Sequence, residues 1–211
     1  SAHLKDVESG KYLSSNNINV LKFGLKKGKD IEGLTIDDLD STMRTSWGKN
    51  LLSEIVEIER KVVNEGVVCN DERSFLTKEG RVFVHHMTKI PIFDQNGKVV
   101  NIYTVSEDIT KSVKLMALFD IYLSLYLQEG VKQAIVFFLK HFDLIDYFNT
   151  LPTRSELIVL ITKMTNPTSK HIARVLDISS RTVDCHLSKI KLKLNIVIED
   201  VLYIIYQSHY N

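Results

Sequence analysis

The segment from Leu176 to Leu194, which reads LDISSRTVDCHLSKIKLKL, constrains the fold of this chain more than any other stretch. Ser179 is a good N-cap, because its hydroxyl can accept a hydrogen bond from a first-turn N–H that has no partner inside the helix. If the helix begins near Ser180, steps of 100° per residue gather four apolar residues in one narrow sector: Val183, Leu187, Ile190 and Leu194. We therefore expect one side of this helix to be buried.

The opposite side of the same helix is mostly polar, with Arg181, Cys185, Ser188 and Leu192 at its centre and Asp184 and Lys189 beside them. Three lysines add positive charge toward the C-terminal half, where cations also suit the helix dipole: Lys189, Lys191 and Lys193. This face can offer hydrogen-bonding groups to a partner. The alternative is an ordinary amphipathic helix whose basic face is only solvated.

The composition is that of a soluble globular protein, with 44% hydrophobic and 25% charged residues. A chain of 211 residues can form one large domain or two small ones. We expect no membrane span and no signal peptide, because the chain lacks a long uninterrupted apolar run and the N-terminus lacks a basic region followed by one. Cys69 and Cys185 lie far apart without metal-type spacing, which favours a reducing, cytoplasmic location.

The net charge of +1 hides an uneven distribution. Residues 151–196 contain eight basic and three acidic side chains, a net charge of +5, so the rest of the chain carries about −4. A basic module joined to a mildly acidic one indicates that the C-terminal part meets a polyanion.

Two more helices are predicted just before this one. Thr153 or Ser155 can cap a helix that runs to about Lys163, and Pro167 forces a break. Thr168 or Ser169 then caps a helix whose inward residues are Ile172, Ala173 and Leu176, and a short turn at Asp177 and Ile178 follows. Two helices joined by so short a turn form a helix-turn-helix, whose second helix enters the major groove of DNA.

The basic module resembles the DNA-binding domain of the LuxR or GerE family. The residues that carry this resemblance are Arg154, Ile172, Ala173, Leu176, Ile178, Ser179, Arg181, Thr182, Val183, His186, Ile190, Lys193 and Leu194. Ser155 departs from the family, where a Glu usually follows the arginine, and a longer Asn166-Pro167-Thr168 connection replaces the usual Gly. These departures affect the expected angle of the helix that ends near Lys163, and they leave the helix-turn-helix itself unchanged.

The resemblance implies roles for ten residues. In the helix that begins near Ser180, phosphate contacts fall on Ser179, Arg181, Thr182 and Lys189. In the helix before it, they fall on Thr168, Ser169 and Lys170. Base-facing positions fall on Asp184, Cys185 and Ser188, where a carboxylate repels phosphate but can accept from cytosine N4. His186 is expected to pack in the core. The family's fourth helix, here within 199–209, often pairs across a two-fold axis, which implies a homodimer.

The first half alternates strand-like and helical patterns. We expect a hairpin from Leu4–Val7 and Lys11–Ser14, a short helix from Asn16 to Leu25, brief turns including Ile36–Leu39, and a longer helix from Lys49 to Asn64. The apolar face of that helix is expected to include Leu52, Ile55, Val56, Glu59 and Val63. Three strands follow, at Val67–Leu76, Val82–Phe93 and Val99–Val105.

This order, with the segments LKDVESGKYLSSNN, DIEGLTIDDL and PIFDQNGKVVNIYTVSEDIT, resembles a PAS domain. The ligand stays open, since the fold does not determine it. Haem is disfavoured because the long helix has no histidine, and flavin-adduct chemistry because Cys69 begins a strand. His85 and His86 point to opposite faces of a strand, so we expect no metal site there. Trp47 and Phe75 are candidate pocket residues, with core packing as the alternative.

Between the two modules, Leu115, Leu118, Tyr122 and Leu125 have the spacing of a short coiled-coil seam, and Gly130 breaks the run. The alternative is that these helices complete a monomeric core. We thus predict an α+β protein with a PAS-like domain (1–110: antiparallel sheet with flanking helices), a helical connector (111–149) and an all-α helix-turn-helix domain of four helices (150–211).

The predicted function is a cytoplasmic bacterial transcriptional regulator. Its PAS-like domain senses a signal or mediates dimerisation, and its partners are double-stranded DNA, a second copy and, as a further candidate, RNA polymerase. The alternative is an interaction module that sequesters another regulator. An enzyme is not expected, because the chain has no Gly-rich phosphate loop, HExxH motif, kinase signature or nucleophile with an evident partner.

Overall fold

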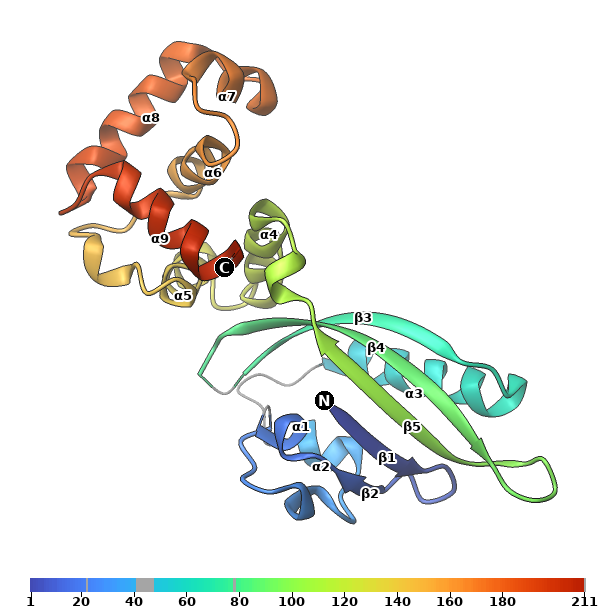
Figure 1. Cartoon of the computed structure of the whole chain (residues 1–211). Helices are drawn as coiled ribbons and strands as arrows, with labels where there is room; N and C mark the ends of the chain where they lie inside the picture. Colours follow the sequence, from blue (N-terminus) through green and yellow to red (C-terminus); the bar gives the residue numbers. More distant parts are fainter. Residues whose placement is uncertain (22, 41–47, 78, 211) are drawn as a thin grey trace. The chain divides into compact units, whose positions relative to one another are not determined.

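The computed structural model describes residues 1–21, 23–40, 48–77 and 79–210 and divides into two compact units, Ser1–Thr110 and Lys111–Asn211. Trp47, one of the candidate pocket residues, lies outside the described residues. Figure 1 labels the helices and strands of both units. No helix in the described part of the chain is long and apolar enough to cross a membrane.

The first unit is a five-stranded antiparallel sheet with helices beside it (Figure 1). The strands are β1 (Ala2–Asp6), β2 (Tyr12–Ser15), β3 (Cys69–Leu76), β4 (Val82–Phe93) and β5 (Val99–Asp108), in the spatial order β2-β1-β5-β4-β3. The helices are α1 (Asn17–Leu21), the 3₁₀ turn η1 (Gly28–Ile31), α2 (Ile36–Asp40) and α3 (Gly48–Glu65), which packs on the sheet. This is the predicted PAS-like order.

Several details of the first unit differ from prediction: β3 begins at Cys69 and not at Val67, and β5 continues beyond Val105 to Asp108. The helix expected to reach Leu25 ends at Leu21, because Gly24 takes a positive φ of 72° and the N–H groups of Gly24 and Leu25 bond back to the carbonyls of Leu21 and Val20. On α3 the buried valine is Val62, whereas Val56 is 55% exposed. The inward stripe therefore follows Ile55, Glu59 and Val62, at spacings of four and three.

Glu59 fastens α3 to the sheet. Its two carboxylate oxygens accept from the Nζ of Lys5 on β1 at 2.7 Å and of Lys89 on β4 at 2.9 Å. Burial alone would raise the pKa of Glu59, but the charges of Lys89 and Lys5 outweigh burial and lower it. The helix and the sheet are thus joined by a buried, ionised group with two cationic partners.

The second unit is helical, with α4 (Leu115–Leu125), α5 (Val131–His141), α6 (Arg154–Lys163), α7 (Ser169–Leu176), α8 (Ser180–Lys193) and α9 (Ile198–Tyr210). The short 3₁₀ turns η2 (Thr110–Ser112) and η3 (Ile145–Tyr147) precede α4 and α6. Gly130 caps α5 with φ 91°, so the predicted break after α4 is present.

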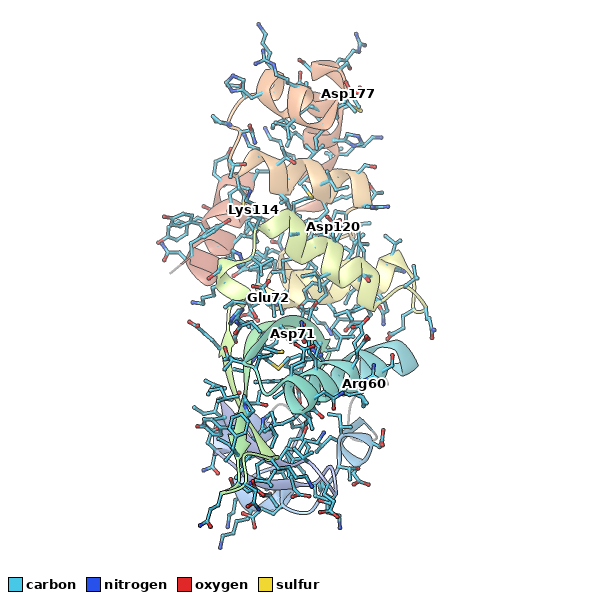
Figure 2. All side chains as sticks on the ribbon, turned by 90° about the vertical axis from the view of Figure 1, so that its right-hand side faces the viewer. Arg60, Asp71, Glu72, Lys114, Asp120 and Asp177 are labelled. Atoms are coloured by element: carbon cyan, nitrogen blue, oxygen red, sulfur yellow. The ribbon has the colours of Figure 1, made fainter. Side chains whose placement is uncertain are left out.

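The connector helices pack within this same unit. Leu115, Leu118 and Tyr122, which have the spacing of a coiled-coil seam, are buried there, and an aromatic cluster surrounds them: Phe119, Tyr126, Phe138 and Phe142. Asp120, a polar residue of α4 labelled in Figure 2, is exposed. Three of the four predicted seam residues therefore complete the core of their own chain, whereas the fourth, Leu125, is half-buried.

Glu156 and Lys193 join α6 to the end of α8. Glu156 completes a capping box with Thr153, whose N–H donates to Oε2 at 2.7 Å, and the Nζ of Lys193 donates to the same oxygen at 2.7 Å. Burial opposes ionisation of Glu156, but Lys193 and the Thr153 N–H outweigh it and lower its pKa. Next to this pair, Phe148 and Leu194 form a β-bridge. The last turn of α8 is thus fixed to the unit.

Replacing Lys193 by Met should lower the free energy of unfolding by about 1–3 kcal/mol, because Glu156 would stay buried without its cation. Urea unfolding of the full chain, followed by circular dichroism, measures this loss. Lys191→Met, at an exposed lysine of the same helix, is the control and should change stability by less than about 0.5 kcal/mol. Equal losses in the two variants would contradict this role for Lys193.

Candidate nucleic-acid interface

Helices α7 and α8 form a helix-turn-helix whose ends are defined by polar caps. The Thr168 hydroxyl accepts from the His171 N–H at 3.3 Å to begin α7, and the Ser179 hydroxyl accepts from the Thr182 N–H at 3.0 Å to begin α8. Between them Asp177 (labelled in Figure 2) adopts the left-handed conformation, with φ 52° and ψ 47°. The chain therefore reverses within three residues, as the sequence predicts.

A small apolar cluster sets the position of the two helices. It contains Val159 of α6, Ile172 and Ala173 of α7 and Val183 of α8, with Leu176, Ile178 and Leu187 packed against it. The methyl side chain of Ala173 permits close contact between the helices. Val183 and Ile190 are fully buried and Leu194 is 8% exposed, so the predicted inward stripe of α8 is present.

The opposite face of α8 is exposed, as predicted from the helical period. Of the ten residues that the sequence singles out, Ser169 is half-buried and the other nine are exposed: Thr168, Lys170, Ser179, Arg181, Thr182, Asp184, Cys185, Ser188 and Lys189. Leu192, at the far end of this face, is 84% exposed. His186 is half-buried instead, and its Nδ1 is buried without a hydrogen-bond partner among the described residues, which fits a packing role.

Asp184 contacts the first turn of α7, which the sequence did not predict. The Ser169 hydroxyl donates to its Oδ1 at 2.6 Å. The carboxylate therefore lies beside a helix N-terminus, where free N–H groups favour negative charge. The two residues are 15 positions apart, and only the packing of α7 on α8 brings them together.

The lysines of α8 divide between two roles. Lys189 and Lys191 are exposed, whereas Lys193 turns inward to Glu156 and to the Leu151 carbonyl. The predicted basic stripe of three lysines is thus shortened to two. With Lys170, Arg174 and Arg181, the exposed cations of α7 and α8 outnumber the exposed acids Asp177 and Asp184. The surface keeps a positive balance that suits a polyanion.

Both units match known families. Residues 152–205 match the family described as "Bacterial regulatory proteins, luxR family", and residues 4–111, about half of the chain, match a PAS domain. A search of the curated proteins found no match.

The first of the following solved structures shares the fold, and the other two are less similar. The complex of Vibrio cholerae VqmA with a ligand and DNA has a TM-score of 0.51 at 20% identity, covering 100% of this chain and 83% of VqmA. The VqmA dimer without target DNA has a TM-score of 0.41 at 19% identity, covering 99% and 83%. The PAS domain of Bordetella pertussis BvgS has a TM-score of 0.42 at 24% identity, covering 59% and 88%.

The two family matches follow the boundary between the two units, with the PAS domain ending at residue 111 and the helix-turn-helix inside the second unit. The chain therefore has a PAS domain in its first half, and residues 152–205 of its second unit match the luxR family of bacterial regulatory proteins.

Proposed function

We propose that the exposed face of α8 enters the major groove of operator DNA, and that through it this luxR-family protein regulates transcription in a sequence-specific way. One observation carries the proposal. Nine of the ten residues singled out from the sequence are exposed, while the apolar stripe of α8 faces the core. A helix buried on one side and polar on the other, with a positive balance, fits the groove of a polyanion.

Phosphate contacts would come from the two helix N-termini and from exposed cations. Thr168, Ser169 and Lys170 begin α7, while Ser179, Arg181 and Thr182 begin α8. Free N–H groups at these ends point outward, and Arg181 and Lys189 would neutralise phosphate charge.

Base contacts would come from Asp184, Cys185 and Ser188, which are all exposed on the outer face of α8. A serine hydroxyl can donate to or accept from a base edge, and a carboxylate accepts from cytosine N4. Because Ser169 already donates to one oxygen of Asp184, that carboxylate would have a restricted orientation in the groove.

A homodimer would place two such helices on inverted half-sites about 10 base pairs apart. The exposed tyrosines of α9 support this arrangement: Tyr203 is 62% exposed, Tyr206 51% and Tyr210 47%. Aromatic side chains are enriched at protein interfaces, and an interface between two α9 helices would cover these three.

The remaining assignments follow from this role. The PAS unit would sense a small molecule, as the ligand in the VqmA complex suggests. The protein would act in the cytoplasm, where bacterial DNA is found, with RNA polymerase as a further partner and without catalytic activity of its own.

Selection from a random duplex library by the purified protein tests the proposal. If no sequence is enriched at moderate salt, the protein instead sequesters another regulator.

Replacing Arg181 by Ala should weaken binding to all duplexes alike and reduce the slope of log K against log salt by about 1, because one phosphate contact is lost. Fluorescence anisotropy over a salt series measures both quantities. Lys132→Ala, at an exposed cation of α5, is the control and should leave the slope unchanged.

Replacing Ser188 by Ala should change the preference at one base pair by about 1–3 kcal/mol and leave the salt slope as it is. Duplex selection with the variant and the unchanged protein measures this. A uniform loss of affinity over the library, like that of the Arg181 variant, would show that Ser188 does not contact a base.

Replacing Asp184 by Asn should raise affinity for most duplexes, since a negative charge near phosphate is removed, and should weaken any preference for cytosine. Asparagine can still accept from Ser169, so the contact between α7 and α8 is kept. Asp177→Asn, which removes an exposed charge from the turn and tolerates the left-handed backbone, is the control. The same change in base preference in both variants would contradict the assignment.

A further inference from the structure

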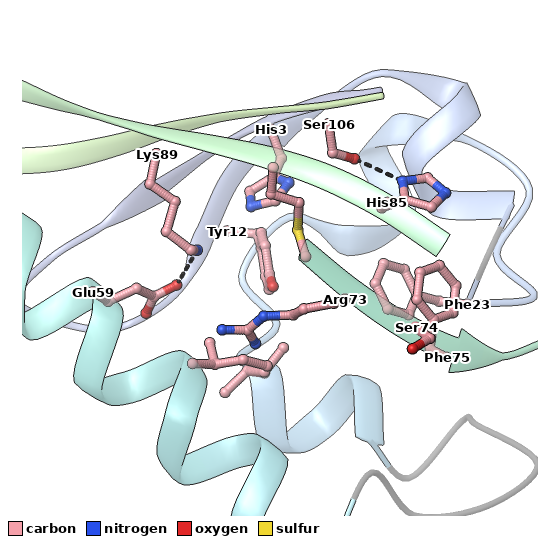
Figure 3. A pocket seen from close by; sticks show the side chains of 13 residues that line it. His3, Tyr12, Phe23, Glu59, Arg73, Ser74, Phe75, His85, Lys89 and Ser106 are labelled. Atoms are coloured by element: carbon pink, nitrogen blue, oxygen red, sulfur yellow. Dashed lines mark hydrogen bonds and ion pairs between the residues drawn. The ribbon is translucent and has the colours of Figure 1, made fainter. Parts of the chain in front are cut away.

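The PAS unit encloses a cavity of about 80 Å³ between its sheet and its helices. Figure 3 shows side chains from several elements that line it, including Tyr12 of β2, Glu59 of α3, Arg73 and Phe75 of β3 and Lys89 of β4. By the space that one water needs, this volume holds roughly six water molecules. A ligand of fewer than about ten non-hydrogen atoms fits without large rearrangement.

Arg73 is a polar group of this cavity whose hydrogen-bonding capacity the described residues satisfy only in part. It is 8% exposed, and its Nε donates to Asp71 on the same face of β3. Its Nη2 is buried and has no hydrogen-bond partner among the described residues. In Figure 3 the guanidinium extends beneath Tyr12 into the space beside Glu59. A buried donor of this kind is costly unless a ligand or water accepts from it.

Among the residues that the structure describes, the charges around the cavity leave an excess of one cation. Lys5 and Lys89 share the single carboxylate of Glu59, and Arg73 pairs with Asp71. Three cations thus face two carboxylates. Burial lowers the pKa of Lys89, and Glu59 opposes this change. One negative charge brought by a ligand would balance the group.

The rest of the wall is mostly apolar or neutral. Phe75 lies 5.2 Å from the ring of His85, centroid to centroid, and the Nδ1 of His85 is 3.1 Å from the Ser106 hydroxyl. His85 is 3% exposed whereas its neighbour His86 is half-buried, so the two point to opposite faces as predicted. Phe75 does line the pocket. These walls suit a ring or a branched aliphatic group.

We propose that this cavity binds a small organic monoanion, an aromatic ring or branched chain with one carboxylate, whose oxygens accept from the Arg73 guanidinium. The inference rests on the proposed sensing role of the PAS unit and names the class of its ligand. Arg73 serves as the anchor because a planar guanidinium matches a carboxylate and forms charge-assisted hydrogen bonds with it.

The test compares isosteres that differ in charge. Ligand-observed NMR on the full chain uses two triplets: benzoate, benzamide and benzylamine, and isovalerate, isovaleramide and isopentylamine. At least one carboxylate should bind about tenfold or more tightly than its amide, and the amines should not bind. Arg73→Met should weaken that carboxylate at least about tenfold. Arg60→Met, at an exposed arginine of α3 (labelled in Figure 2), is the matched control and should leave binding unchanged.

Amides or amines that bind as tightly as the carboxylates would overturn the proposal, and so would the absence of any binding at millimolar concentration. Both results come from the unchanged protein and do not depend on how a variant folds. Arg73→Lys, which keeps the charge but loses the planar fork, should bind with intermediate affinity.

Duplex selection is measured separately. Carboxylate binding without DNA selection would refute the regulatory role, and the reverse would refute only the ligand class.

Discussion

The contact between Glu156 and Lys193 is the constraint on which the position of the exposed face of α8 depends. The side chain of Glu156 is 4% exposed, and it accepts from both its own helix cap and the end of α8. The Asn149 N–H donates to the Lys193 carbonyl at 2.8 Å, and Asn195 donates to Tyr147, so the backbone is held there too. With its last turn fixed and Val183 packed against Ala173, α8 has little freedom to rotate about its axis. The exposed face is therefore set by the core.

A buried carboxylate joins distant segments in the PAS unit as well, but the charges are matched differently. Glu156 has one lysine and one cap N–H, whereas Glu59 has two lysines, and Arg73 lies in the same cavity. Among the described residues, the helical unit therefore has a balanced ion pair, whereas the PAS unit has three cations for two carboxylates around its cavity. A buried excess of one sign of charge is unfavourable, so a fold that retains it is consistent with a ligand that supplies the balance.

The helix-turn-helix could be predicted closely because local chemistry defines it. Caps at Thr168 and Ser179 and a stripe with the helical period fix where helices begin and which side is buried. The role of Lys193 could not be predicted, because periodicity does not reveal that a carboxylate 37 positions away will accept a hydrogen bond from its ammonium group. The same holds for Ser169 with Asp184, and for Leu115, Leu118 and Tyr122, where the same spacing fits a partner helix or an intramolecular core. Local sequence patterns therefore predict which face of a helix is buried, but not which residues that face contacts.

The position of Asp184 affects how such a surface can combine affinity with selectivity. Its carboxylate lies beside the N-terminus of α7, an end that would otherwise attract phosphate. It thus weakens the sequence-independent attraction on which most non-specific binding depends. In the proposed complex, the inward turn of Lys193 would reduce the electrostatic contribution of α8, and base contacts would account for a larger share of the binding energy of a single module. In a dimer, the second module would bind the same DNA at a high effective concentration. Pairing of the two modules would therefore strongly increase the affinity for an operator.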